Sequence, residues 1–289
     1  MTTLVNINGK FFPDGKASIS VFDRGFLFGD SIFEVLRTYN GRLFAFDMHM
    51  DRLEQSAAQI SFKLPLSREA IFREMTRTVK KTGNHESYVR IVVTRGASSK
   101  IGMDPSTAAN PQAIIIVQDF QPPPEDISKR AVRAALVTLR RNPSDSLAPS
   151  IKSGNYLNSV LAHIEAKSAG AAEAIMLNHQ GNVTEGTVFN LFIVSGGEIL
   201  TPPLSAGILD GITRKVIIRQ AREAGLKFKE ANFNGKRLLQ ADEVFFTSTL
   251  REVQPVVKIG ETVIGGGKPG PVTTRVLQIF REAVEPYLS

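Results

Sequence analysis

The sequence of 289 residues contains no cysteine, so it can form neither disulfide bonds nor thiolate metal sites. It also lacks a long apolar run, because the strongest one, residues 113–117, has only the length of a strand. No basic segment followed by an apolar stretch opens the chain, so we expect no signal peptide. These absences favour a cytoplasmic protein that does not bind a membrane.

A metal centre and a nucleic-acid interface are not expected either. The four histidines lie far apart and have none of the spacings of metal ligands. The net charge of +7, from 35 Lys and Arg against 28 Asp and Glu, could attract nucleic acid. The basic residues are scattered, however, and no motif that enters a groove or stacks bases is present. A basic nucleic-acid-binding protein is therefore the weakest of the hypotheses.

Length and composition predict two domains. With 42% hydrophobic and 22% charged residues, the chain can bury a substantial core in one large or two modest domains. Three consecutive prolines, Pro122 to Pro124, stiffen the chain and remove backbone donors, as in a linker. We therefore expect a smaller N-terminal domain over residues 1–118, a linker over residues 119–126 and a larger domain over residues 127–289.

The order of the predicted elements is mixed. In the first domain, alternation predicts strands at 7–12 and 17–21, around Pro13-Asp14-Gly15, and at 88–95 and 113–118. Apolar periodicity predicts helices at 48–60 and 68–80. Residues 30–39 could form a helix by pattern, but Asn40-Gly41 beyond them indicates a hairpin. The second domain is expected to contain strands at 133–139, 173–178, 188–194 and 243–248, and helices at 155–168, 213–224 and 272–284. This order predicts an α/β or α+β fold.

Lys152 is the most informative single residue. It lies between Ile151 and a Gly-Asn turn, just ahead of a predicted amphipathic helix with apolar positions Leu157, Val160, Leu161 and Ile164. A lysine at a helix entrance, with its ammonium group in a partly desolvated pocket, is a candidate Schiff-base nucleophile. In isolation an ordinary solvated lysine is the commoner case.

Glu185 is the second candidate, between a turn and a strongly apolar strand. A carboxylate at the edge of a core is costly unless a cation meets it. A protonated pyridine nitrogen is such a cation, and the carboxylate would hold the ring in its electron-sink form. The alternative is a loop glutamate at a strand entrance.

Three further segments suit a phosphate group. The amides of Ile212 and Thr213 open a predicted helix and could form a phosphate cup. Ser248 and Thr249 end an apolar strand with hydroxyl groups. Arg52 lies on a predicted helix, and arginine is suited to bidentate phosphate recognition. Ordinary helix capping, an ordinary strand end and an exposed arginine are the respective alternatives.

Together these segments resemble one family in order and spacing. The chain resembles the class IV pyridoxal-phosphate enzymes, which include branched-chain aminotransferases, D-amino-acid transaminases and aminodeoxychorismate lyases. The resemblance extends from about residue 6 to about residue 280. The matching motifs are Asp23-Arg24-Gly25-Phe26-Leu27-Phe28-Gly29-Asp30, the Lys152 segment, Thr184-Glu185-Gly186, Gly211-Ile212-Thr213-Arg214 and Thr247-Ser248-Thr249.

The resemblance implies a role for each matching position. Lys152 would form the Schiff base with pyridoxal phosphate and then move the proton between the substrate α-carbon and the cofactor C4′. Glu185 would pair with the pyridine nitrogen. The phosphate would be held by Arg52, the amides of Ile212 and Thr213, and Thr249, with Ser248 nearby. Tyr156 would hydrogen-bond the phenolate oxygen, Leu209 would pack on the ring and Asn190 would support the site.

The resemblance also implies the architecture and the assembly. The expected fold is the two-domain α+β or α/β fold of type IV pyridoxal-phosphate enzymes, with a smaller N-terminal α/β domain, a larger C-terminal domain and the cofactor at their interface. A homodimer would complete each active site from the other subunit.

The substrate positions are mixed between subfamilies. Tyr88-Val89-Arg90 resembles the Tyr-x-Arg strand of branched-chain aminotransferases, but Phe28 stands where many of those carry tyrosine and Leu250-Arg251 replaces two small residues. Compared with D-amino-acid transaminases, Lys100 and Gly102 replace the carboxylate-binding arginine and histidine, and Phe33 replaces a tyrosine. The cations left as candidates to bind the substrate carboxylate are Arg24, Arg90 and Lys100.

The leading hypothesis is a transaminase that moves an amino group between an α-amino acid and a 2-oxo acid, with a branched-chain L-amino acid and 2-oxoglutarate as the expected pair. A D-amino-acid transaminase and an aminodeoxychorismate lyase are the alternatives within the family. A non-catalytic binder of pyridoxal phosphate or another phosphate ligand is the alternative from a different class.

Overall fold

The computed structural model describes residues 3–289 and divides them into two compact units. Unit 1 extends from the start of the described chain to Pro122 and includes Ile151–Asn155 and Pro286–Ser289; unit 2 consists of Pro123–Ser150 and Tyr156–Glu285. The first crossing lies inside the expected linker. The two short segments differ from the predicted division, which placed them in the second domain. They join unit 1 because their backbones hydrogen-bond to it, as Lys152 O does with Phe33 N (2.9 Å) and Ser289 O with Leu43 N (2.9 Å).

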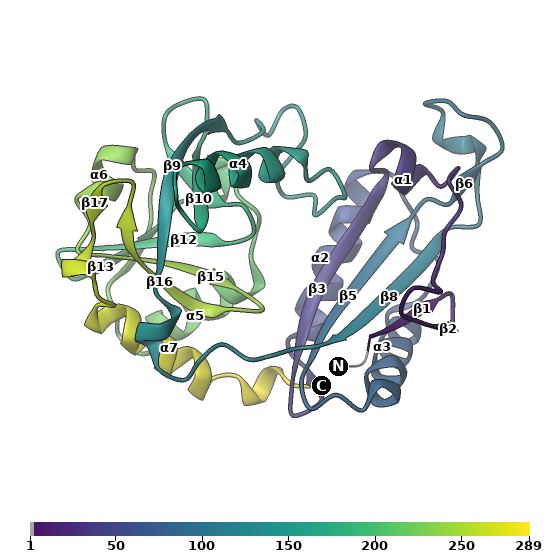
Figure 1. Cartoon of the computed structure of the whole chain (residues 1–289), viewed down its shortest axis with the longest axis horizontal. Helices are drawn as coiled ribbons and strands as arrows, with labels where there is room; N and C mark the ends of the chain where they lie inside the picture. The colour runs from purple at the N-terminus through teal and green to yellow at the C-terminus, as the bar shows by residue number, and fades with distance from the viewer. Residues whose placement is uncertain (1–2) are drawn as a thin grey trace. The chain divides into compact units, whose positions relative to one another are not determined.

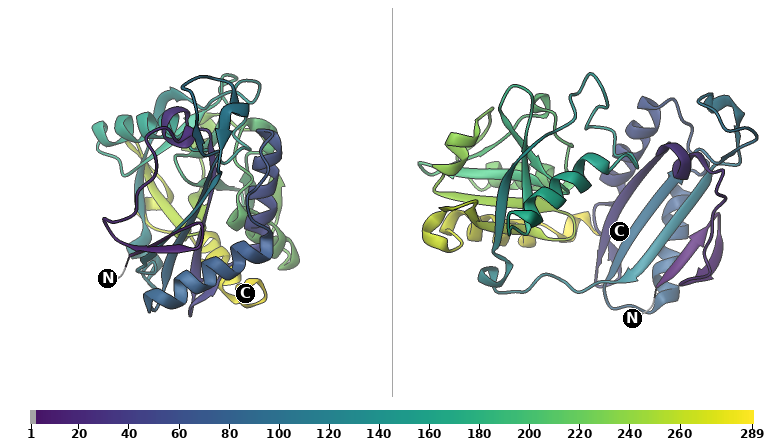
Figure 2. Two further views of the ribbon diagram at one scale, coloured as in Figure 1. Left: turned by 90° about the vertical axis from the view of Figure 1, so that its right-hand side faces the viewer. Right: turned by 45° about the horizontal axis from the view of Figure 1, so that its top comes forward.

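Unit 1 is a six-stranded sheet with neighbours in the order β2-β1-β8-β5-β3-β4, all antiparallel. Helices α2 and α3 lie on one face of this sheet (Figures 1 and 2). The elements are β1 (Leu4–Ile7), β2 (Lys10–Pro13), α1 (Arg24–Phe28), β3 (Ser31–Tyr39), β4 (Arg42–Leu43), α2 (Phe46–Gln59), α3 (Arg68–Thr82), β5 (Ser87–Thr94), β8 (Gln112–Asp119) and a separate small pair, β6 (Ala97–Ser98) and β7 (Ala108–Ala109).

The core of unit 1 follows from the periodicity of its helices. Met50 and Leu53 on α2 and Met75 on α3 are fully buried against Leu36 of β3 and Val89 of β5. Apolar residues three and four apart face one side of a helix, so each helix presents a continuous stripe to the sheet. The predicted helices at 48–60 and 68–80 and strands at 88–95 and 113–118 are confirmed as α2, α3, β5 and β8.

One predicted hairpin in unit 1 is wrong and another is confirmed. The first hairpin turns at Asn8-Gly9, where both residues have positive φ (50° and 85°), and residues 17–21 are not a strand. A two-residue turn of this hand matches the twist of paired strands better than the predicted Pro-Asp-Gly turn. The Asn40-Gly41 hairpin between β3 and β4 forms as expected, so residues 31–39 are a strand.

Unit 2 is a nine-stranded sheet that curls into a ring. The order β11-β10-β9-β16-β15-β12 is closed because β11 also pairs with β12, while β13, β14 and β17 extend it. The strands are β9 (Val132–Arg140), β10 (Glu173–Leu177), β11 (Val183–Gly186), β12 (Asn190–Ser195), β13 (Glu198–Thr201), β14 (Phe228–Glu230), β15 (Glu243–Ser248), β16 (Glu252–Ile259) and β17 (Thr262–Val263). The helices are α4 (Leu157–Ser168), α5 (Ile212–Glu223), α6 (Gly235–Leu239) and α7 (Pro271–Glu282).

The elements predicted for the second domain are confirmed as β9, β10, β12, β15, α4, α5 and α7. Strands β11, β13, β14, β16 and β17 were not predicted, because several are too short for a clear alternation. Helix α4 packs on β9 and β10, and helices α5 and α7 pack on each other and on β15 and β16 (Figure 1). Within residues 3–289 no helix has the length and apolarity needed to cross a membrane.

Helix α4 packs with its small residues inward. Ser159, Ala162 and Ala166 are its buried positions, and the last two belong to a small core formed with β9 and β10. The large apolar residues point away from the sheet and are 46–68% exposed, namely Leu157, Val160, Leu161 and Ile164. The predicted amphipathic helix therefore exists, but its large apolar side chains stay about half exposed.

Candidate active site

Lys152 belongs to unit 1, where its backbone is fixed along the edge of β3. Its carbonyl accepts from Phe33 N (2.9 Å), and Gly154 N donates to Ser31 O (2.9 Å). Its own amide donates to Ser56 Oγ of α2 (3.2 Å). The half-buried side chain then places Nζ 4.6 Å from the centre of the Phe33 ring. A lysine fixed at its backbone and resting on an aromatic face has a defined position, unlike a solvated surface lysine.

Phe33 also meets a second cation. The guanidinium of Arg90 lies 4.0 Å from the centre of the same ring. On β5, Tyr88 and Arg90 alternate with the buried Val89, so they point away from the helix-covered core. The structure thus brings together Phe33, Arg90 and Lys152, three residues singled out in the sequence, and places Tyr88 on the same strand face as Arg90.

The other face of β3 carries a buried ion cluster that includes Arg52. Glu34, which is 0% exposed, accepts from Arg52 Nε at Oε1 (2.7 Å) and from Arg52 Nη2 at Oε2 (2.7 Å). His49 Nδ1 lies 2.7 Å from Oε2 of the same carboxylate. The Arg52 guanidinium and the His49 hydrogen bond hold the pKa of Glu34 far below its ordinary value, although burial alone would raise it. Arg52 is therefore not the exposed helix arginine of the alternative hypothesis.

Glu185 belongs to unit 2 and is buried within a set of donors. Its Oε1 pairs with Arg141 Nη2 (2.8 Å), and its Oε2 accepts from Asn190 Nδ2 (3.1 Å) and Leu209 N (3.1 Å). The register of β11 and β12 sets Glu185 directly opposite Asn190. Glu185, Asn190 and Leu209, to which the family resemblance gives separate roles, therefore form one cluster.

The N-terminus of α5 adjoins this cluster. Gly211 precedes the helix, and among the described residues no side chain caps it. A Cβ on Gly211 would overlap Asn190 Oδ1, so the close approach requires glycine. Thr213 Oγ1 is buried without a hydrogen-bond partner within residues 3–289. Uncapped amides at Ile212 and Thr213, next to an unsatisfied hydroxyl, make this end of the helix suited to an anion.

The end of β15 lies beside the same cluster, because Thr247 is directly opposite Asn190 in the pairing of β12 with β15. Ser248 pairs with Glu252, so Thr249, Leu250 and Arg251 form the tip of a tight hairpin. Arg251 is drawn to the side by an ion pair with Glu173 (2.6 Å). Ser248, Thr249 and Leu250 are half-buried at this tip, as expected for groups that a ligand can reach.

Arg24 and its loop have a different arrangement from the one expected. Arg24 is buried; its Nε pairs with Asp30 (2.8 Å), and its Nη atoms donate to the carbonyls of Gly102 (2.8 Å) and Met103 (3.1 Å). Its guanidinium also lies 5.0 Å from the Phe28 ring. The side chain therefore holds the loop that carries Lys100, which is itself exposed. Of the three cations considered for the substrate carboxylate, Arg24 has its guanidinium hydrogen-bonded to an acid and to loop carbonyls, whereas that of Arg90 lies over the Phe33 ring.

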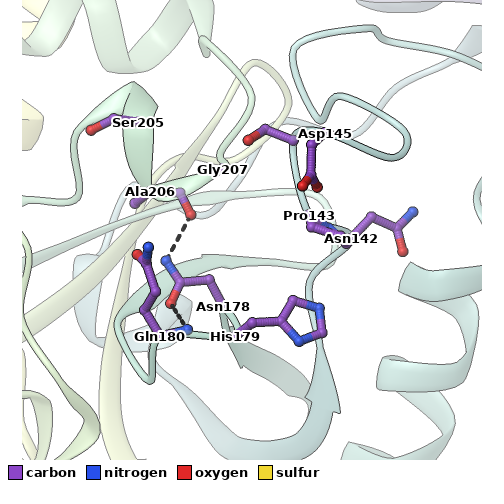
Figure 3. Close-up of a pocket in the computed structure, with 10 residues that line it drawn as sticks. Asn142, Pro143, Asp145, Asn178, His179, Gln180, Ser205, Ala206 and Gly207 are labelled. Atoms are coloured by element: carbon purple, nitrogen blue, oxygen red, sulfur yellow. Dashed lines mark hydrogen bonds between the residues drawn. The ribbon is translucent and has the colours of Figure 1, made fainter.

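A cavity of about 490 Å³ in unit 2 is lined by residues 142–145, 178–180 and 205–207. Figure 3 shows its lining, with the Asn178 side chain hydrogen-bonded to Ala206 O (3.1 Å) and Gln180 N (3.0 Å). Neither lysine nor arginine is among its lining residues, and Asp145 is. The cavity is therefore suited to neutral or cationic groups and not to a carboxylate.

Tyr156, the candidate to hydrogen-bond the phenolate oxygen of the cofactor, is half-buried at the start of α4.

Over residues 3–289, the structure has no group of three or more His, Cys, Asp or Glu side chains that could hold a metal ion. The buried acids Glu34 and Glu185 face arginines instead.

Comparison with known proteins identifies the class. The amino-transferase class IV family matches residues 31–259. The chain therefore belongs to the class IV aminotransferases, and the predicted family and enzyme class, a transaminase, are confirmed.

Individual relatives agree with this assignment. A protein of Methanocaldococcus jannaschii, provisionally named a branched-chain-amino-acid aminotransferase, is 40% identical over 96% of this chain and 95% of its own length. A D-alanine aminotransferase of Staphylococcus haemolyticus is 35% identical over 98% of both chains. The crystal structure of a branched-chain aminotransferase from the archaeon Thermoproteus uzoniensis with norvaline superposes with a TM-score of 0.91 at 31% identity, covering 100% of this chain and 99% of that one. The predicted type IV fold is confirmed; the homodimer, the cytoplasmic location and the residue roles stay predictions.

Two residues of the site were missed in the sequence. Arg141 was not among the predicted site residues, because nothing in the local sequence links it to Glu185, 44 positions further on. Glu34 had a usable signal, because an acid inside the apolar strand Ile32-Phe33-Glu34-Val35-Leu36 must find a buried cation.

Proposed function

We propose that this chain is a pyridoxal-phosphate-dependent aminotransferase that moves an amino group between an α-amino acid and a 2-oxo acid, with a branched-chain L-amino acid and 2-oxoglutarate as its preferred pair. The observation that carries the proposal is the position of Lys152. Its backbone is hydrogen-bonded to β3 and to α2, and its Nζ rests on Phe33 beside Arg90. A fixed amine next to an apolar ring and a second cation suits a nucleophile that meets a substrate carboxylate.

The residues present fit pyridoxal phosphate. At the phosphate end, the unpartnered Thr213 hydroxyl, the uncapped amides of α5 and the glycine at position 211 form a cradle for an anion. At the other end, Glu185 is a buried carboxylate, which suits a protonated ring nitrogen. We assign the phosphate to Arg52, Ile212, Thr213, Ser248 and Thr249, the ring nitrogen to Glu185, the ring face to Leu209 and the phenolate oxygen to Tyr156, with Asn190 supporting Glu185.

When bound, pyridoxal phosphate supplies an electron sink for the charge that develops at the substrate α-carbon. The chain supplies the rest. Lys152 Nζ is the amine that carries the cofactor and then moves a proton at the α-carbon. Arg141, Asn190 and the Leu209 amide hold Glu185 in one orientation, which fixes the tilt of any ring that pairs with it. Arg90 binds the substrate carboxylate, and Phe33 orients the guanidinium.

The substrate assignment follows from Phe33 and Arg90. Phe33 stands where D-amino-acid transaminases carry a tyrosine, so it brings no hydroxyl group beside Lys152 and Arg90, and this favours an aliphatic side chain. Arg90 belongs to the Tyr88-Val89-Arg90 strand that resembles branched-chain aminotransferases, and it is not tied to another loop as Arg24 is. The higher identity to the archaeal relative than to the D-alanine enzyme points the same way.

A donor panel tests the substrate. L-leucine, L-valine, D-alanine and D-glutamate are offered with 2-oxoglutarate or pyruvate as acceptor, and the new amino acid is measured. We expect turnover with the L-donors and 2-oxoglutarate. Activity restricted to D-donors would replace this assignment by a D-amino-acid transaminase. Release of aminobenzoate and pyruvate from aminodeoxychorismate, without transamination, would replace it by a lyase.

A lysine substitution tests the chemistry. We expect Lys152→Ala to lose the yellow colour of the holoenzyme and all turnover, whereas Lys100→Ala, in an exposed loop of the same unit, keeps the colour. Turnover that persists in Lys152→Ala would contradict the proposed role. A coloured wild-type chain that turns over none of the donors would be a non-catalytic binder.

We also propose a homodimer, supported by the exposed face of α4. Leu157, Val160, Leu161 and Ile164 form an apolar stripe that a two-fold related copy could cover. We expect Leu161→Glu to shift the wild-type dimer to monomer in light scattering, and Lys167→Glu, on the exposed C-terminal turn of the same helix, to leave it unchanged. A dimer that survives Leu161→Glu would exclude this face.

A further inference from the structure

Glu34 is an acid in a strand that is otherwise apolar. It follows Ile32 and Phe33 on β3, and all three are 3% exposed or less. A buried carboxylate is costly unless it is paired and hydrogen-bonded. Its partners, His49 and Arg52, are three positions apart on α2, so they lie on the same face of the helix, above the strand.

The contacts of Glu34 fix the orientation of Arg52. The fork formed by Nε and Nη2 meets both carboxylate oxygens at 2.7 Å, which is the bidentate geometry of arginine with a carboxylate. A guanidinium held in this way can rotate neither about its own bonds nor toward solvent, and Arg52 is 6% exposed. The outward edge of the guanidinium is the side away from Glu34, made of Nη1 and the second N–H of Nη2. Because the bidentate contact fixes the guanidinium, this edge points in one fixed direction.

His49 acts on the same carboxylate. The imidazole is 0% exposed, and burial lowers its pKa below the ordinary value of 6.5, so the ring is neutral at pH 7. A neutral ring next to a carboxylate donates its Nδ1–H, and the distance to Oε2 is 2.7 Å. His49 adds no charge to the cluster, so its contribution is to keep Glu34 in the orientation that Arg52 requires.

From this geometry we infer that Glu34 and His49 are positioning residues that aim the outward edge of Arg52 at the cofactor phosphate. The inference deepens the proposed function and rests on it. Glu34 neutralises the charge of Arg52, so long-range attraction for a phosphate is weak and the gain comes from two aligned N–H donors. An Arg52 that is loose or turned would lose that alignment while keeping its charge.

The test compares a cofactor that has the phosphate with one that lacks it. Apo forms of the full chain are titrated with pyridoxal 5′-phosphate and with pyridoxal, and binding is followed by absorbance. We expect Glu34→Gln to weaken pyridoxal phosphate binding by about tenfold to a hundredfold, since it removes a charged hydrogen-bond pair. Pyridoxal binding should change by less than about threefold, because pyridoxal has no group for Arg52 to hold.

Matched variants separate positioning from damage to the fold. His49→Gln keeps the volume of the ring approximately and should give a smaller loss of the same kind. Glu54→Gln, an exposed acid on α2, should leave both affinities unchanged. In a double-mutant cycle, Glu34→Gln added to Arg52→Lys should cost little more than Arg52→Lys alone, because Glu34 acts through Arg52.

The outcomes are distinct. A preference for pyridoxal phosphate over pyridoxal that is the same in Glu34→Gln, in His49→Gln and in the wild type would overturn the inference, as would an equal loss for both cofactors. If Glu34→Gln does not fold, the preference in His49→Gln decides alone. A wild-type chain that binds neither cofactor would overturn the proposed function itself, and the inference with it.

Discussion

Each unit contributes to the proposed site a buried acidic residue that faces an arginine, but the two clusters are built in different ways. In unit 1, the partners of Glu34 are His49 and Arg52, which come from one helix and are three residues apart. In unit 2, the donors to Glu185 come from three separate segments, with Arg141 44 positions before it and Leu209 24 positions after it. The first cluster needs only α2 to pack on β3. The second requires β9, β10, β11 and β12 to pair side by side and the segment that carries Leu209 to reach them.

The two carboxylates also differ in what holds them. Glu34 has a charged or ring donor on both oxygens and is 0% exposed, as in a closed ion pair. Glu185 has its arginine on one oxygen and two neutral donors, Asn190 and an amide, on the other. A carboxylate that has only neutral donors on one of its oxygens keeps more capacity to pair with an incoming cation there. This difference agrees with a supporting role for Glu34 and a cofactor-facing role for Glu185.

The largest effect is expected at a third acid, Glu252 in unit 2, which has two cations but no proposed ligand. It pairs with Arg130 (2.9 Å) and Arg281 (3.0 Å) and is 2% exposed. Glu252→Gln would leave the buried Arg130 without its anion and Arg281 with only the exposed Glu125, and we expect the free energy of unfolding to fall by about 3 kcal/mol. Urea unfolding of the full chain measures it. Glu261→Gln, an exposed acid beyond the same strand, is the control and should not change the midpoint.

If Glu252→Gln were as stable as the wild type, the buried pairs of Glu252 with arginine would contribute little to the free energy of unfolding. The comparison of the two units would then depend only on Glu34 and Glu185. The position has a second constraint, because Glu252 has a φ of 57°, a conformation that favours glycine. Glu252→Gly should therefore lose less stability than Glu252→Ala, which has the strain without the ion pairs.

The second prediction concerns the dispersed cluster. Arg141→Gln removes the arginine that donates to Glu185 and allows the carboxylate to turn. We expect kcat/KM to fall by about 100-fold, the scale of a small misplacement of a catalytic group. Arg140→Gln, at the exposed neighbouring position, is the matched control and should keep full activity. Equal activity in the two variants would mean that Asn190 and the Leu209 amide suffice to orient Glu185.

The contrast between the clusters also explains what the sequence could predict. Elements with strong periodicity, such as α2, α3, β5 and β8, were predicted because their burial pattern repeats every 3.6 or 2 residues. The Asn8-Gly9 hairpin was missed, although the dipeptide is a strong signal, because a Pro-Asp-Gly turn signal competes with it a few residues further on. Cofactor positions were predicted from motifs, in which the order of residues along the chain is sufficient.

Contacts between distant segments could not be predicted in the same way. Arg141 reaches Glu185 only because β9 and β11 both flank β10 in the closed sheet, and no local pattern contains that information. The pattern of apolar residues in the sequence also could not predict that the large apolar side chains of α4 point away from the sheet. A stripe of Leu, Val and Ile predicts an amphipathic helix, but the choice between large and small residues for the inner face depends on the distance to the sheet, and here the small face packs.

The third prediction uses acid to probe the cluster of unit 1. His49 is fully buried and hydrogen-bonds Glu34, and burial lowers its pKa below 6.5, helped by the charges of Arg52 and Lys152. The imidazole therefore takes up a proton near pH 6.5 in the unfolded chain, but only at lower pH in the folded chain. Its contribution to the free energy of unfolding is fully present above pH 6.5 and decreases as the pH falls. The slope from this group is at most about 1.4 kcal/mol per pH unit. Urea unfolding between pH 7 and pH 5 measures how the free energy of unfolding changes with pH. We expect this change to be smaller in His49→Gln than in the wild type and in the exposed His85→Gln control.

Glu34 adds a second acid-sensitive step in the same direction. Its pKa is far below the ordinary 4.5 in the folded chain, so its contribution is present above about pH 4.5 and is lost as the pH falls further. His49→Gln should leave this lower step in place. If the free energy of unfolding changed with pH equally in His49→Gln and in the wild type between pH 7 and pH 5, the imidazole would protonate in the folded chain as well. Glu34 would then face a cation on both sides.

The smallest effect compares two helix N-termini, one in each unit. Helix α3 of unit 1 is capped by Ser67, whose Oγ accepts from Ala70 N (3.3 Å), whereas α5 of unit 2 follows Gly211 without a side-chain cap among the described residues. We expect Ser67→Ala to reduce unfolding free energy by about 1 kcal/mol, with unchanged affinity for pyridoxal phosphate. Gly211→Ser offers α5 a cap, but its Cβ would overlap Asn190 Oδ1 and its hydroxyl would occupy the amides assigned to the phosphate. It should therefore weaken cofactor binding whatever it does to the helix, and tight binding in this variant would place the phosphate elsewhere.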